Sequence, residues 1–158
     1  MVEFRIGQGI AIHAFSEDPQ RKMVLAGVQF DGPGLVGHSD ADLVAHACMD
    51  ALLGAVGLGD LGECYPDTDE QYIDADSMSL LAETVSVLHA EGWEVVNLDC
   101  SVIAESPSLS LYRNEMERRL GSVLGGSVRV TGRRPEGLGS LGRGEGMSCL
   151  AVVLVKRQ

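Results

Sequence analysis

The sequence is short of positive charge and has no long apolar run. It holds 12 lysine and arginine residues against 23 acidic residues, a net charge of −11 at pH 7. Nucleic-acid-binding domains normally carry a basic face, so this balance argues against a broad role of that kind. No uncharged apolar run approaches the ~20 residues that span a membrane, and no charged-then-apolar signal segment is present. A small anionic ligand at a local basic cluster remains compatible with the charge.

Cysteines are few and have no recognisable spacing. None forms a C-x-x-C pair, and their intervals match no zinc-binding or disulfide framework. We therefore expect Cys48, Cys64, Cys100 and Cys149 to be reduced thiols, packed mostly as small hydrophobic residues. This pattern predicts a cytoplasmic protein.

The length of 158 residues and the hydrophobic content of 45% predict one domain, residues 1–158, with a substantial core. Apolar periodicity and turn residues predict strands over 4–15, 23–30, 94–105, 127–132 and 147–157, and helices over 39–56, 78–92 and 110–125. In the third strand, we expect Val96, Leu98, Cys100 and Val102 to face inward. The order favours an α+β fold with helices packed on one face of a mixed β-sheet.

The segment HSDADLVAH, residues 38–46, holds the densest group of polar side chains. If a helix begins near Ser39, Asp42 and His46 are four residues apart and share one face, with Asp50 next in the row. Spacing alone is equally consistent with a solvated polar face.

His13 lies alone in the apolar stretch GIAIHAF. A single histidine on an apolar strand is more often a hydrogen-bonded core residue than a ligand. If the fold brings this strand beside the first helix, His13 and His46 supply the two imidazoles that a transition-metal site needs as a minimum.

Two loops carry further candidates. The polar stretch 59–77 is long for a structureless connection, and loops of that length are often functional. The stretch GRRPEGLGSLGRGEG places Arg133 and Arg134 beside flexible glycines, a local positive spot suited to phosphate oxygens. Its spacing matches neither the P-loop nor the dinucleotide fingerprint.

Taken together, these motifs resemble the 2-C-methyl-D-erythritol 2,4-cyclodiphosphate synthase family over nearly the whole chain. The motifs that carry the resemblance are H-S-D-x-D-x-x-x-H, D-A-L-L-G, G-D-x-G, P-D-T-D, A-D-S and G-R-G-E-G, in that order. The resemblance implies a phosphorus–oxygen lyase of isoprenoid biosynthesis that forms a homotrimer with active sites between subunits. In that family, the 2-phosphate of a CDP-linked methylerythritol attacks the β-phosphorus and CMP leaves. Zinc held by one Asp and two His, and a second divalent ion, magnesium or manganese, assist.

Site residues follow from the resemblance alone. It assigns the metal ligands His13, His46 and Glu136, and the catalytic residues His38, Arg134 and Glu136. It assigns substrate binding to Ser39, Asp60, Leu61, Gly62, Tyr65, Pro66, Asp67, Thr68, Asp69, Ala104, Pro107, Arg133 and Arg143.

The chain departs from the family pattern at the metal and phosphate positions. The D-x-H of the first strand is AIH here, so Ala11 stands where the family has its zinc aspartate. A threonine run of the family is Arg133, Arg134 and Pro135. Catalytic zinc usually has three protein ligands, so we expect a weakened two-histidine site. The arginines can offset part of the loss, because a guanidinium carries phosphate charge.

Two functions therefore stay open at this stage. One is a cyclodiphosphate synthase with an altered metal and phosphate site. The alternative is a non-catalytic paralogue, a trimeric scaffold or sensor that binds a nucleotide diphosphate or an isoprenoid phosphate.

Overall fold

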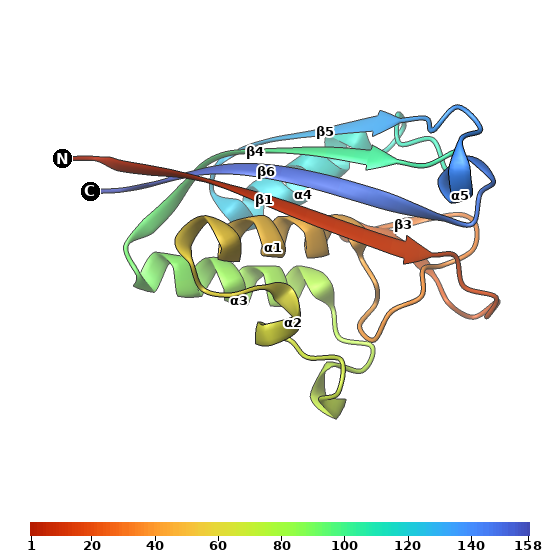
Figure 1. The fold of residues 1–158 in the computed structure, drawn as a ribbon, viewed down its shortest axis with the longest axis horizontal. Helices are drawn as coiled ribbons and strands as arrows, with labels where there is room; N and C mark the ends of the chain where they lie inside the picture. Colours follow the sequence, from red (N-terminus) through yellow and green to blue (C-terminus); the bar gives the residue numbers. More distant parts are fainter.

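A four-stranded mixed sheet forms the frame of the molecule in the computed structural model, which describes residues 1–158 (Figure 1). Its spatial order is β1 (Glu3–Ala14), β6 (Gly146–Arg157), β4 (Trp93–Ile103) and β5 (Ser127–Arg133). The β4–β5 pair is parallel, and the other two pairs are antiparallel. The sheet thus places β1 and β5 at opposite edges.

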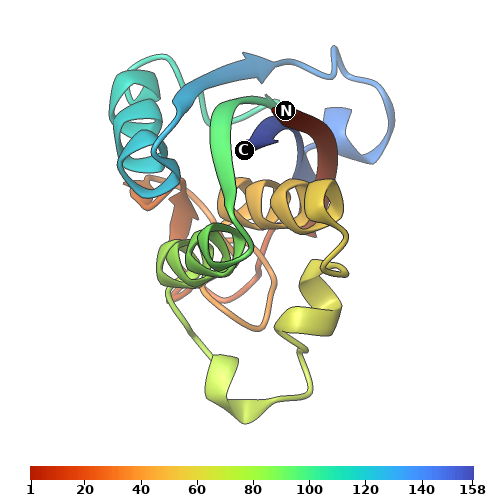
Figure 2. The same cartoon turned by 90° about the vertical axis from the view of Figure 1, so that its left-hand side faces the viewer.

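Three long helices lie on one face of this sheet, as the sequence predicts (Figure 2). They are α1 (Leu43–Val56), α3 (Ser77–Ala90) and α4 (Arg113–Leu124). Helix α1 packs on β1 and β6, α4 packs on β5, and α3 packs against α1. None of the helices has the length and apolar character needed to cross a bilayer.

Short elements occupy the connections. They are the hairpin β2 (Met23–Leu25) and β3 (Val28–Phe30), the single turns α2 (Leu61–Cys64) and α5 (Gly139–Gly142), and the 3₁₀ turn η1 (Glu70–Tyr72). The polar stretch 59–77 therefore contains two helical turns.

Strand β1 lies unusually close to α1. A Cβ atom at Gly7 would overlap the carbonyl oxygen of Ala51, and one at Gly9 would overlap that of Ala47. Only glycine permits this approach of backbone to backbone. The contact fixes the far end of β1, which carries His13, against the helix that carries His46.

Two strand predictions were wrong in detail. Residues 23–30 form a hairpin, because Ala26 (φ 51°) and Gly27 (φ 72°) adopt the left-handed conformation of a tight turn. In β4, a bulge between Val95 and Asn97 shifts the alternation, so Val95 is buried in the core and Val96 is only partly buried.

The first long helix begins at Leu43, four residues later than predicted, because Asp42 is its N-cap. The Asp42 carboxylate is fully buried and accepts N–H groups of Val44 and Ala45 in the helix and of Ala26 and Gly27 in the hairpin turn. The expectation that Asp42 points with His46 was therefore wrong, since the carboxylate is used by backbone donors.

The sheet face opposite the helices is apolar along its β1 edge. Its exposed residues include Phe4, Ile6, Ile10, Ile12 and Val152. Ile6 and Ile12 are 73% and 70% exposed, although strand residues of this type are normally covered. Exposed apolar residues gathered on one sheet face mark an interaction surface.

Candidate functional site

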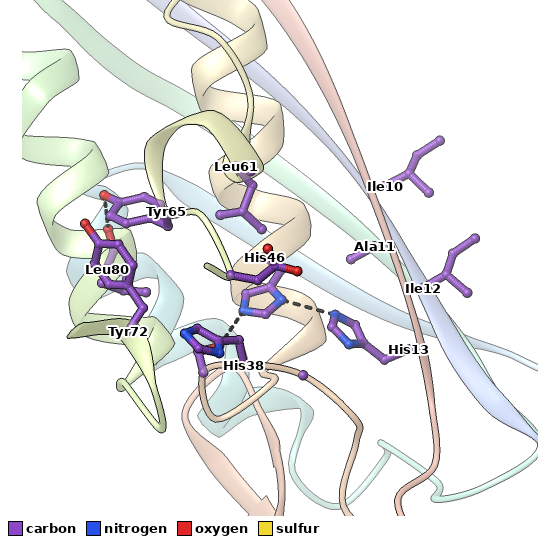
Figure 3. Close-up of a pocket in the computed structure, with 14 residues that line it drawn as sticks. Ile10, Ala11, Ile12, His13, His38, His46, Leu61, Tyr65, Tyr72 and Leu80 are labelled. Atoms are coloured by element: carbon purple, nitrogen blue, oxygen red, sulfur yellow. Dashed lines mark hydrogen bonds between the residues drawn. The ribbon is translucent and has the colours of Figure 1, made fainter. Parts of the chain in front are cut away.

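The two histidines singled out in the sequence meet in one pocket. His13 on β1 and Ala11 point toward α1, whereas Ile10 and Ile12 point to the other side of the sheet (Figure 3). The His13 Nε2 atom lies 3.1 Å from His46 Nδ1. They are not two unrelated core histidines, because the two rings are in contact and line one cavity of about 470 Å³.

Hydrogen bonds determine which ring nitrogens carry hydrogen. His13 Nδ1 lies 2.5 Å from the carbonyl oxygen of Val36, which can only accept, so Nδ1 is the protonated nitrogen. In the neutral ring, Nε2 of His13 is then an unprotonated acceptor. It faces His46 with its lone pair available.

The His46 ring is also held by hydrogen bonds. Its Nε2 atom lies 3.0 Å from the hydroxyls of Ser39 and Ser77, and Ser77 donates its own hydrogen to Asp40. With the Ser77 hydrogen used by the carboxylate, the Ser39 hydroxyl is able to donate to His46 Nε2. His46 Nδ1 then carries the hydrogen and donates to His13 Nε2 at 3.1 Å in the metal-free protein. Burial, with a smaller effect of His13, lowers the pKa of His46 to about 4, so the ring is neutral near pH 7.

His13 Nε2 and His46 Nδ1 share one hydrogen across 3.1 Å in the metal-free protein, and a metal cation that displaces this hydrogen would bind both nitrogens. Two nitrogens that bind one zinc at about 2.0 Å with tetrahedral angles lie about 3.3 Å apart. His13 and His46 therefore fit two positions of a zinc site. Ala11 presents only a methyl group to the same pocket, and no three His, Cys, Asp or Glu side chains are grouped to hold a metal.

The histidine pocket, as we call this cavity, also gathers some of the residues predicted to bind substrate. Its predicted members are His13, His38, Ser39, His46, Leu61, Gly62, Tyr65 and Asp67. His38 Nε2 donates to the Asp69 carbonyl oxygen at 2.8 Å and so ties the 35–39 segment to the 59–77 stretch. Sequence reasoning missed Tyr72 and Leu80, which line the pocket but belong to no recognisable motif.

A second cavity, the arginine pocket, lies at the β5 edge of the sheet. It measures about 330 Å³, and its lining includes Ala104, Pro107, Arg133 and Arg134 from the prediction together with Arg113. Nine of the 12 lysine and arginine residues form a salt bridge with a carboxylate. The three that form none are Lys22, Arg113 and Arg133. Two of these three unpaired cations thus line one pocket. Sequence reasoning missed Arg113, whose proximity to Arg133 depends on the packing of α4 against β5.

Six predicted residues line neither pocket, namely Asp60, Pro66, Thr68, Asp69, Glu136 and Arg143. Asp60 and Asp69 are N-caps of α2 and η1. Glu136 is exposed at φ 55° in the loop after β5, and Arg143 pairs with Glu145 at 2.6 Å. Within one chain, Glu136 is not grouped with the histidines.

The chain matches known proteins along its whole length. The YgbB family model matches residues 4–156. A protein of Rubrobacter xylanophilus, named 2-C-methyl-D-erythritol 2,4-cyclodiphosphate synthase, is 47% identical over 98% of this chain and 96% of its own length. A protein of the same name from Chlorobaculum parvum is 45% identical over 98% of this chain and 99% of its own length.

Solved structures agree with the fold. The bifunctional IspDF from Campylobacter jejuni superposes with a TM-score of 0.94 at 40% identity; the match covers all of this chain and 43% of that one. The IspF–CDP complex from Plasmodium falciparum gives a TM-score of 0.85 at 28% identity over 98% of this chain and 97% of that one. The α+β fold predicted from the order of strands and helices is confirmed. On these matches and on the geometry of the histidine pocket, the chain belongs to the YgbB family.

Proposed function

We propose that this protein is a 2-C-methyl-D-erythritol 2,4-cyclodiphosphate synthase with an altered metal site. The observation that carries the proposal is the pair of facing ring nitrogens of His13 and His46 in one pocket with predicted substrate-binding residues. In the proposed reaction, an oxygen of the substrate 2-phosphate bonds to the β-phosphorus. The bond from the β-phosphorus to the CMP oxygen breaks, and CMP leaves with that electron pair.

The residues of this chain take the following roles in the proposal. His13 and His46 would hold a divalent metal, which polarises a phosphoryl oxygen when bound. Leu61, Gly62, Tyr65 and Asp67 would enclose the methylerythritol portion in the histidine pocket. Ala104 and Pro107 would contact the nucleotide in the arginine pocket. Glu136 would bind the second ion, magnesium or manganese, together with the substrate phosphates.

We propose that the arginine pocket supplies positive charge that the metal site lacks. Arg113 and Arg133 have no carboxylate partner, and Arg134 Nε lies a loose 3.6 Å from Glu105. In a chain with a net charge of −11, unpaired guanidinium groups attract a diphosphate selectively to this edge. Arginine also presents a planar fork that matches phosphate oxygens.

The position of the two pockets supports a homotrimer with shared sites. The histidine pocket borders β1 and the arginine pocket borders β5, and these edge strands are three strand spacings, about 14 Å, apart. A cyclic arrangement of copies can bring the β1 edge of one protomer to the β5 edge of the next. The exposed apolar sheet face would be buried in such an assembly. One continuous hydrophobic core supports a single domain in each protomer, and four free cysteines support a cytoplasmic location.

A non-catalytic paralogue is the second candidate, and Ala11 is the observation that favours it. Such a protein would bind a nucleotide diphosphate at the arginine pocket without turning it over. The two candidates share their binding properties and differ in whether CMP is released.

Release of CMP tests the proposal directly. Purified protein is incubated with CDP-methylerythritol 2-phosphate, zinc and either magnesium or manganese, and both CMP and the cyclic diphosphate are quantified. We expect both products in equal amounts, at a rate that falls when EDTA is added. CDP binding without CMP at high protein concentration would instead establish the non-catalytic paralogue.

Removing the unpaired arginines tests the charge assignment. We expect R113A and R133A each to weaken CDP binding about tenfold in EDTA, because each removes a charge-assisted hydrogen bond. Calorimetric titration with CDP measures the change. K22A is the matched control: it removes the third unpaired cation, which lies outside the arginine pocket, and should leave the affinity unchanged. Equal losses in all three variants would contradict a local site.

A further inference from the structure

Arg21 makes an unusual set of contacts for a residue that lies in no motif. Its Nε atom donates to the Leu35 carbonyl oxygen at 3.0 Å, and Nη2 donates to the carbonyl oxygens of Gly37, at 2.9 Å, and of Ser39. Its Nη1 atom pairs with Asp74 at 3.0 Å. The Arg21 side chain is only 18% exposed, whereas that of Asp74 is 77% exposed. Most of the guanidinium is therefore used on backbone oxygens.

The three carbonyls that Arg21 binds belong to alternate residues of the 35–39 segment. The carbonyl between the first two of these in the chain is not among the oxygens that Arg21 binds. That carbonyl is the one of Val36, and it accepts from His13 Nδ1. One guanidinium thus anchors the residues on either side of the oxygen that determines the His13 tautomer.

The same segment also reaches His46. Ser39 is its last residue; the carbonyl of Ser39 accepts from Arg21, and its hydroxyl lies 3.0 Å from His46 Nε2. Anchoring the Ser39 backbone restricts where that hydroxyl can lie. Arg21 therefore acts on both rings through a segment of five residues, without contacting either ring.

We infer that Arg21 is a positioning residue, which holds the 35–39 segment so that the Val36 carbonyl accepts from His13 Nδ1 and the Ser39 hydroxyl lies against His46 Nε2. The importance of this arrangement for catalysis rests on the proposed function, but the His13 tautomer itself can be measured without substrate or metal. Lysine cannot replace Arg21, because one ammonium group cannot reproduce the planar set of donors that spans residues 35, 37 and 39.

Side-chain nitrogen chemical shifts measured by NMR test this inference on metal-free protein in EDTA, near pH 8 where neutral imidazoles predominate. In the wild type, we expect one tautomer of the His13 ring, with hydrogen on Nδ1. In R21A, we expect the second tautomer of His13 to gain about fivefold in population, as for the loss of one hydrogen bond. R21K should show the same direction of change and serves as the second variant if R21A does not fold.

D74N is the matched control. It removes the charge partner of Arg21 but none of the contacts to the 35–39 segment, so the His13 tautomer should stay as in the wild type. Folded R21A or R21K with an unchanged His13 tautomer would overturn the inference, and a change in D74N equal to that in R21A would assign the effect to the ion pair. Neither result bears on CMP release, so failure here is distinguishable from failure of the proposed function.

Discussion

Replacing Ala11 by aspartate is expected to raise zinc affinity by at least about a hundredfold. Residues 11 and 13 lie on the same side of β1, and both point into the histidine pocket (Figure 3). A carboxylate at position 11 would complete the three protein ligands that catalytic zinc usually has. Loss of an outer-shell partner alone costs up to about a hundredfold in affinity, and a direct ligand contributes at least as much.

The free energy of unfolding of the A11D variant should also depend on zinc. Ala11 is 9% exposed, so an unpaired carboxylate there lowers the free energy of unfolding when EDTA is present. Saturating zinc should restore it, because a ligand that binds only the native state stabilises that state. Calorimetric zinc titration and melting curves in EDTA and zinc measure both effects, and the CMP assay reports any gain in turnover.

A11N is the control for A11D, since it has nearly the same shape and lacks the negative charge. We expect it to remain close to the wild type in zinc affinity. If A11D and A11N bind zinc equally, or if the wild type retains one zinc per protomer after dialysis, another group already replaces the aspartate.

The largest expected loss of stability comes from D42A. In the wild type, the Asp42 carboxylate accepts hydrogen bonds from four backbone N–H groups, two in α1 and two in the β2–β3 turn, at 2.7 to 3.1 Å. Loss of the helix cap costs about 1 kcal/mol, and buried donors left without a partner cost about 2 kcal/mol more. We therefore expect urea unfolding to show a decrease of about 3 kcal/mol.

D76A and D42N separate the parts of this effect. Asp76 caps α3 from an exposed position, so D76A should cost only about 1 kcal/mol. Burial raises the pKa of Asp42 to about 6, against an ordinary value near 4. The native state then binds more protons between these values, so wild-type stability should fall as the pH rises from about 4 to about 6. D42N should lack this slope; an unchanged slope would assign it to another group.

The parts of the fold that depend on local periodicity could be predicted from the sequence. The long strands and helices, and the left-handed Gly57 and Gly125 that end α1 and α4, follow local rules. The hairpin at Ala26 could not be predicted, because an alanine with positive φ is stabilised there by Asp42, far along the chain. The β4 bulge is similarly set by its pairing with β6.

The site, like the fold, could be predicted only in part. His13 and His46 were identified because they match a family motif. Ala11 was identified because it replaces the aspartate of that motif. Arg21, Ser77 and Arg113 were not identified, because each acts through tertiary contacts with residues distant in sequence. A single sequence encodes those contacts only through the complete fold.

The backbone contact of Gly7 and Gly9 with α1 has an evolutionary consequence. It brings the two histidines together without help from a bound metal, so selection for folding protects the arrangement of the site but not the residue at position 11. Ala11 is buried, and its methyl group packs well in the core, so the fold does not need a carboxylate at this position. Lineages can therefore lose or regain the ligand by substitution at one position, while the rest of the pocket persists as an inherited framework.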